Sequence, residues 1–417
     1  MTDSNSIRDL VTVSARSVAP VRPVDRKRWA WALSPLWICL PLAGMGLASA
    51  TGAGAWNWLT LALFFLVLPV LDAVVGSDPN NPAEATIEQL NRDPYYRILT
   101  YLTVPVHYLT FLAVAWYAAT QPLGVSSVLG LTLSIGLING LAINTGHELG
   151  HKKRGLDRWL AKITLAIVGY GHFSVAHNRG HHKDVATPED PASSRLGENI
   201  YAFVVREVSG AWRHAWTSEA ARLSRRGQRV WSPGNEVLQP LVLTVLLYAA
   251  MIAVLGPIML IFLPLQAAFG WWQLTSANFI QHHGLLRRRG ADGRYERCRP
   301  EHSWNANQII TNLMLFQVQR HSDHHANAAR PYQSLRNFEG LPELPSGYPA
   351  MFALAYVPWA WRRVMDRRVI AWARGDLSKI NLDPALSPTR HARYARLATA
   401  WRRPGPGPLP DTGLIHG

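Results

Sequence analysis

The sequence predicts an all-α membrane protein with six transmembrane helices, paired as three hairpins beneath a helical cap that holds a histidine-rich metal site. Two observations predict this fold: charged residues are segregated from three long apolar stretches, and histidines gather where those stretches end. Only 17% of the 417 residues are charged, against about 25% in ordinary soluble domains. The 48% apolar content excludes a disordered chain, and two cysteines, Cys39 and Cys298, exclude a disulfide framework.

The three apolar stretches are each long enough for two membrane crossings. From Trp29 to Gly76 the only charged residue is Asp72, and the stretches 99–146 and 237–286 contain no Asp, Glu, Lys or Arg. One crossing takes roughly 20 residues, and turns containing Gly or Pro divide each stretch. The expected spans are about 30–50, 56–76, 99–119, 125–146, 237–256 and 258–281. The net charge of +15 would suit a nucleic-acid binder, but these stretches would not, so no nucleic-acid partner is expected.

Basic clusters at the bases of the hairpins predict their orientation. The clusters occupy 26–28, 152–154 and 287–289, whereas the turns within the hairpins carry no Lys or Arg. The positive-inside rule puts both termini and these bases in the cytoplasm, as in a multi-pass protein of a bacterial-type inner membrane. Residues 1–28 are then a cytoplasmic N-terminal segment, 29–375 the membrane domain with its cytoplasmic cap, and 376–417 a C-terminal tail.

Nine of the 16 histidines fall in four short motifs at the predicted membrane boundary. Spacings of three and four residues put side chains on one face of a helix, and imidazole is the usual protein ligand of Fe, Zn, Cu and Ni. Nine imidazoles exceed the demand of one ion, so the sequence predicts two metals. Zinc alone is disfavoured, because structural zinc sites close at four ligands. The predicted ligands are His147, His151, His177, His181, His182, His282, His321, His324 and His325.

The motifs resemble those of the membrane alkane 1-monooxygenases, which are integral-membrane non-haem di-iron alkane hydroxylases. The sequence HELGHK at 147–152 and the box at 177–182 match that family's first two histidine boxes. The HSWN sequence at 302–305, followed by QRHSDHHA at 319–326, matches its third signature. The likeness runs from about residue 30 to about residue 375, so the membrane domain is expected to be a di-iron hydroxylase domain.

This resemblance implies a reaction and its partners. The expected cofactors are two non-haem irons, with O₂ as co-substrate, and the expected reaction converts n-alkanes or alkyl chains to primary alcohols. Electrons would come from a rubredoxin (or a ferredoxin) with its NAD(P)H-dependent reductase, because the chain has no flavin, haem or iron–sulfur signature. The positive net charge fits an acidic partner. The hydrocarbon substrate would enter from the lipid bilayer.

Two departures from the family pattern leave the substrate open. Gln281 stands where the family usually has Glu, and His283 stands where it usually has Tyr. Relatives that hydroxylate the methyl groups of xylenes look similar, so methyl hydroxylation of alkyl-aromatics is the alternative reading. A fatty-acyl desaturase is disfavoured by the H-x-x-x-H-H form of the second box and by six spans. A metal transporter is disfavoured because its histidines would lie mid-membrane.

Polar residues near the histidines are expected to orient the ligand rings. A metal-bound imidazole donates its second N–H to a carboxylate, carbonyl or water. We predict that the residues beside the ligands include Glu148, Asp184, Glu189, Asp190, Gln281, His302 and Asp323. Histidines outside the motifs, such as His214 and His391, are expected to contribute little.

Overall fold

The computed structural model describes residues 25–402, and this part of the chain is helical, with isolated β-bridges but no strand. The predicted all-α class is therefore confirmed. The helices of the apolar stretches and the links between them are α1 Leu33–Trp37, α2 Leu40–Thr51, α3 Leu59–Ala62, α4 Leu68–Val75, α5 Glu84–Arg92, α6 Pro94–Thr120, α7 Val125–Gly150, α12 Leu238–Leu255 and α13 Met259–Gln281. The remaining helices are α8 Gly155–Ala166, α9 Phe173–Ala176, α10 His182–Asp184, α11 Ile200–Ser224, α14 Ile309–Met314, α15 His321–Ala326, α16 Tyr348–Ala355, α17 Pro358–Trp372 and α18 Pro388–Arg402.

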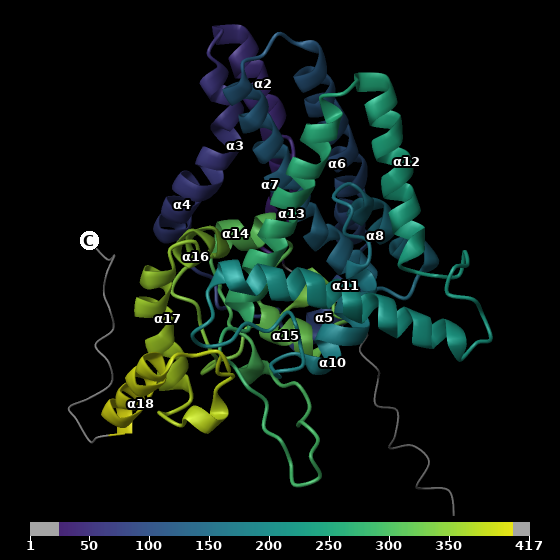
Figure 1. Ribbon diagram of the computed structural model, residues 1–417. Helices are drawn as coiled ribbons and strands as arrows, with labels where there is room; N and C mark the ends of the chain where they lie inside the picture. Colours follow the sequence, from purple (N-terminus) through teal and green to yellow (C-terminus); the bar gives the residue numbers. More distant parts are fainter. Residues whose placement is uncertain (1–24, 403–417) are drawn as a thin grey trace, which may run out of the picture.

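The helices of the apolar stretches extend together to one end of the molecule (Figure 1). Four helical segments are long and apolar enough to cross a membrane: Gly54–Val75, Pro94–Thr120, Val125–Gly150 and Leu238–Leu255. A fifth span is formed if Arg28–Trp37 and Leu40–Thr51, which are bent by 56° at their break, count as one. The composition of the described helices thus gives four or five spans, and the sixth stays a prediction.

The sixth expected span corresponds to α13. Its packing explains why it has a lower hydropathy than the four spans named above. This helix carries Gln266, Gln273 and Asn278, all buried inside the protein. Gln266 bonds to Asn139 of α7 and to the backbone oxygen of Ile167. A helix surrounded by other helices can carry amides that a lipid-facing helix would exclude, because its partners satisfy them.

Helices α7 and α13 cross at small residues. A Cβ atom on Gly140 would lie 2.8 Å from the backbone oxygen of Gly270, and one on Gly136 would lie 2.8 Å from that of Gln266. Glycine at both positions lets the two backbones approach closely. Beyond this crossing, His147 near the end of α7 and His282 just after α13 each join one of two clusters of histidines.

The cap gathers at the other end of the molecule, where α10, α11, α15, α17 and α18 lie (Figure 1). Part of the expected C-terminal tail is folded: a 3-10 turn at Leu377–Lys379 precedes α18, which packs on α17. Tyr394 of α18 donates a hydrogen bond to the buried Asp366 of α17. The rest of the tail, 403–417, and residues 1–24 lie outside the described residues.

Candidate metal centre

The nine predicted histidines come together in two adjacent groups. Within each group, one ring nitrogen of every member lies within 4.8 Å of those of the others. The first group, called group one below, contains His147, His151, His177, His182 and His324. The second, called group two, contains His181, His282, His321 and His325. The rings of His182 and His325 connect the groups, with centroids 4.5 Å apart.

A π-helical turn sorts the second histidine box between the two groups. Residues His177–His181 form this turn, in which the amide of His182 bonds to the carbonyl of His177. The turn brings the Nε2 atoms of His177 and His182 to 3.0 Å. His181 instead joins group two. An α-helix would put His177 and His181 on one face, whereas this wider turn sends them to different groups.

The short helix α15 contributes to both groups. His321 and His325 are one turn apart, with Nε2 atoms separated by 2.9 Å, and belong to group two. His324 points to group one, where its Nε2 atom lies 2.9 Å from that of His147 and 3.2 Å from that of His182. Because one helix of six residues supplies both groups, the relative position of the groups is fixed locally.

The chemistry of these histidines fits metal ions. Two neutral imidazoles can face each other through nitrogens only if one donates a proton, and here several Nε2 atoms converge. The Nε2 atoms of His151 and His181 are buried without a hydrogen-bond partner. Burial, and then the neighbouring rings, lower the pKa of His182 to about 2. The ring of His182 is thus held neutral, which is the form that ligates metal.

Two of the nine rings have acceptors that fix their tautomers. His181 donates from Nδ1 to the Oδ2 atom of Asp190 at 2.8 Å, and Ser193 donates to the same oxygen. His282 donates from Nδ1 to the backbone oxygen of His302 at 3.0 Å. In both rings Nε2 is the nitrogen left to bind a metal. Asp190 and His302 therefore lie where the sequence placed orienting groups, although His302 acts through its backbone.

The other expected orienting carboxylates lie elsewhere. Glu148 pairs with Lys152 at 2.7 Å, and Asp184 pairs with Lys183. Glu189 is 3.5 Å from the hydroxyl of Tyr295. Asp323 accepts hydrogen bonds from Asn327 and from the backbone of Arg336, so it orders the loop after α15 rather than a ring. All of these carboxylates are close to the histidines in sequence, but of them only Asp190 has a hydrogen bond to a histidine ring among the described residues.

The two departures, Gln281 and His283, take different positions. Gln281 borders the metal centre and donates a hydrogen bond to the hydroxyl of Tyr348 at 2.7 Å. His283 lies outside both groups. Its Nε2 atom accepts from Trp361 at 3.2 Å, so Nδ1 carries the proton, which it donates to Ser194. His283 is thus a packing residue with both ring nitrogens satisfied.

An apolar cavity of about 60 Å³ reaches both groups of histidines. Its walls come from α7, α13 and α16, and His147 and His177 of group one and His321 of group two face it. Leu141, Ile143, Leu274, Ala277, Leu315, Val318 and Phe352 make the wall apolar. The wall is apolar where the cavity approaches the histidine groups, so the cavity suits an apolar group rather than a polar one.

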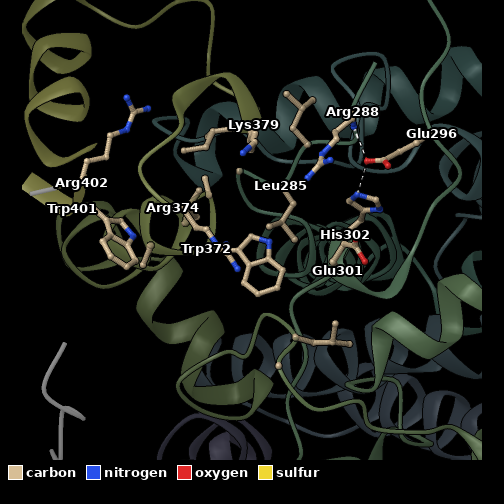
Figure 2. Close-up of a pocket in the computed structure, with 18 residues that line it drawn as sticks. Leu285, Arg288, Glu296, Glu301, His302, Trp372, Arg374, Lys379, Trp401 and Arg402 are labelled. Carbon is tan, nitrogen blue, oxygen red and sulfur yellow. Dashed lines mark hydrogen bonds and ion pairs between the residues drawn. The ribbon is translucent and has the colours of Figure 1, made fainter. Parts of the chain in front are cut away.

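A larger cavity of about 950 Å³ lies in the cap, and His302 stands in its wall (Figure 2). Cations gather around it, namely Arg288, Arg374, Lys379 and Arg402, together with Trp372 and Trp401. Glu296 and Glu301 are its acidic residues. His302 connects this cavity to group two, because its backbone oxygen holds His282.

Sequence reasoning missed several residues of the centre. Glu207 of α11, Asn278 of α13 and His214 of α11 border a small cavity behind His177 and His181. A Cβ atom on Gly180 would lie 2.6 Å from the ring of His214, which places this histidine against the second box. Spacing along the chain carries no signal for these residues, since α11 meets the centre only in the folded protein. His391 is exposed on α18, so it is a better control than His214 for substitutions of the clustered histidines.

Comparison with known proteins shows the family. The fatty acid desaturase family model matches residues 125–355. An alkane 1-monooxygenase of Pseudomonas putida is 58% identical over 87% of this chain and 90% of its own length. One of Acinetobacter baylyi is 42% identical over 89% of this chain and 91% of its own length. The hydroxylase component of the xylene/toluene monooxygenase of Pseudomonas putida is 26% identical over 58% of this chain and 63% of its own length.

These relatives and the apolar helices identify a membrane protein, and the buried histidine groups give it a candidate metal site. The matches to alkane 1-monooxygenases extend over most of both chains, whereas the match to the xylene/toluene enzyme is shorter and weaker. The chain is an enzyme and belongs to the alkane 1-monooxygenase family.

Proposed function

We propose that this enzyme hydroxylates the terminal carbon of n-alkanes or alkyl chains to primary alcohols, at a centre of two irons held by the nine histidines. One observation carries the proposal: an apolar cavity between the helices reaches two adjacent groups of histidines whose ring nitrogens converge. The balanced reaction is R–CH₃ + O₂ + 2 e⁻ + 2 H⁺ → R–CH₂OH + H₂O. Iron, when bound, supplies the activation of O₂, which no protein side chain can supply.

The side chains would position the substrate and the ligands. Leu141, Ile143 and Phe352 bind hydrocarbon without offering it a polar partner, and the cavity directs the end of a chain at His147 and His321. Holding the reacting carbon against the centre lowers the entropic part of the barrier. Asp190 keeps the ring of His181 in the tautomer that presents Nε2 to a metal.

Product analysis tests the substrate class. Whole cells that produce the chain are expected to convert octane or hexadecane to the primary alcohol. The identities favour this outcome, since the alkane enzymes match far better than the xylene/toluene component. Gln281 favours the second candidate, methyl hydroxylation of alkyl-aromatics, because it departs from the usual Glu. Conversion of p-xylene in preference to both alkanes would establish that candidate instead.

We place the active-site cap in the cytoplasm of an inner membrane, with both termini on that side. The basic clusters at the bases of the hairpins support this orientation. A reporter fused after Leu123, in the turn between α6 and α7, is expected to be periplasmic, and one fused after Arg289 is expected to be cytoplasmic. A cytoplasmic signal from Leu123 would contradict the six-span arrangement.

The electron donor is proposed to be a rubredoxin that docks at the cavity of the cap. Arg374 and Lys379 face this cavity, so acidic side chains of a donor would find complementary charge there (Figure 2). The backbone of His302 then joins the wall of the cavity to His282 through one hydrogen bond. This connection gives electrons a short covalent and hydrogen-bonded path to group two.

A further inference from the structure

A carboxyl group without a cationic partner lies buried behind the metal centre. Glu207 of α11 is 1% exposed. Its two oxygens accept from the hydroxyl of Thr275 at 2.8 Å and from the amide of Asn278 at 3.2 Å, both on α13. No ion pair of Glu207 occurs among residues 25–402. A buried carboxylate is expected to be paired with a cation, so a buried group held only by neutral donors calls for a reason.

Glu207 borders a cavity of the right size for one water. The cavity has a volume of about 20 Å³, and His177, His181 and Asp190 stand in its walls with Glu207. A water needs about 10–15 Å³ of such volume and polar partners. Asn278, His177 and Phe173 also line the apolar substrate cavity. One layer of side chains therefore separates the carboxyl from the chamber where the reaction is proposed to occur.

The other ionisable groups around this cavity are less suited to donate a proton, because they are held by hydrogen bonds, have a high pKa or are proposed metal ligands. Asp190 is held by His181, by Ser193 and by the backbone of Ala192. The hydroxyl of Tyr170 faces Glu207 but can only give up a proton at high pH. His214, on the same helix, is half-buried and stands in the wall of the cavity.

We propose that Glu207 delivers protons to the reaction through the water that fits this cavity. This inference rests on the proposed function, whose reaction consumes two protons in an apolar chamber that cannot supply them. Glu207 passes its carboxyl proton to the water, and the water passes one of its own protons toward the oxygen atom that leaves as H₂O. The resulting carboxylate takes up a proton from solvent on the side of His214. The two electrons come from the redox protein already named.

The local chemistry suits this task. Burial raises the pKa of Glu207 to about 7, although the hydrogen bonds from Thr275 and Asn278 act in the opposite direction. A proton donor works best when its pKa is close to the pH at which it operates. The carboxylate of Asp190, in the wall of the same cavity, also raises the pKa of Glu207.

Two variants separate proton delivery from a structural role. In the complete system with alkane and saturating donor, kcat of the wild type is expected to fall as pH rises through the pKa of Glu207. Glu207→Gln is expected to lower kcat by about 100-fold, within the usual range for a lost acid–base group, and to remove this pH dependence. Thr275→Val keeps the carboxyl but removes a bond that favours its charged form, so the fall in kcat should move to higher pH.

A spectroscopic measurement provides a readout besides activity. The infrared spectrum of the purified holoenzyme at pH 6 should contain a protonated carboxyl signal that Glu207→Gln removes and that Thr275→Val keeps to higher pH. The inference is overturned if Glu207→Gln retains wild-type kcat and pH profile, or if that signal is absent from the difference spectrum. A purely structural Glu207 would give equal losses in both variants with no change in pH profile. A wild type that hydroxylates no hydrocarbon would refute the proposed function, while the infrared result would still report on Glu207.

Discussion

Replacement of His325 by alanine is expected to abolish hydroxylation. His325 lies 2.9 Å from His321 in group two, and its ring is the closest link to His182 of group one. Loss of this nitrogen opens the ligand set of one metal and disturbs the contact with the other. Because changes outside the ligand set already cost about 10–100-fold, removal of a ligand should lower kcat by at least ~1,000-fold. The measurement is alcohol formed per enzyme, normalised to the amount of folded protein in the membrane.

Three further variants are expected to lose less activity than His325→Ala. Asp190→Asn keeps the ligand but weakens the acceptor of His181, so a loss of about 10–100-fold in metal affinity or activity is expected. Asp184→Asn is the matched control, since Asp184 contacts Lys183 rather than a histidine of the centre. His391→Ala, at an exposed position of α18, should leave activity unchanged. Equal activity in His325→Ala and His391→Ala would remove the histidine groups from the mechanism.

Membranes that contain this chain alone are expected to form no alcohol from alkane and NADH. The described residues provide the histidine groups and a basic cavity, but the electrons must reach them from a second protein. Addition of rubredoxin and its reductase should start turnover. Added salt should slow it, because charges on the docking surface are screened within about 10 Å at 0.1 M ionic strength. Rapid alcohol formation from NADH by the purified chain alone would contradict an external donor.

A pair of charge reversals locates the docking surface. Arg374→Glu in the cap cavity is expected to raise the donor concentration needed for half-maximal rate, with little change in the apparent KM for alkane. Arg225→Glu is the control, because Arg225 follows α11 and is exposed outside that cavity. An equal response of both variants to donor concentration would place the docking surface elsewhere.

The apolar helices and the clustering of the nine histidines could be predicted from sequence for the same physical reason. An apolar bilayer excludes charge, and a metal centre needs several imidazoles, so both leave strong marks in composition and spacing. The helix of the predicted sixth span, α13, has a lower hydropathy than the other four because it packs among helices and carries Gln266 and Gln273. Its amides are satisfied by neighbours that no local pattern reveals.

The division of the histidines between two groups could not be predicted. An α-helical spacing pairs His177 with His181, whereas the π turn pairs His177 with His182. The acceptor of His282 is a backbone oxygen that is 20 residues away in sequence. Glu207 reaches the centre because α11 packs on α13. Each of these contacts depends on tertiary packing rather than on local sequence.

Metal analysis of the purified protein tests the central claim most directly. Two buried groups of five and four imidazoles predict about two Fe per chain, with the content reduced in His325→Ala and in His182→Ala. The protein should be prepared without chelators, and iron and zinc should be measured in the same sample against the protein concentration. One tightly held Zn per chain with no Fe would contradict the di-iron account, as would full iron content and full activity in His321→Ala.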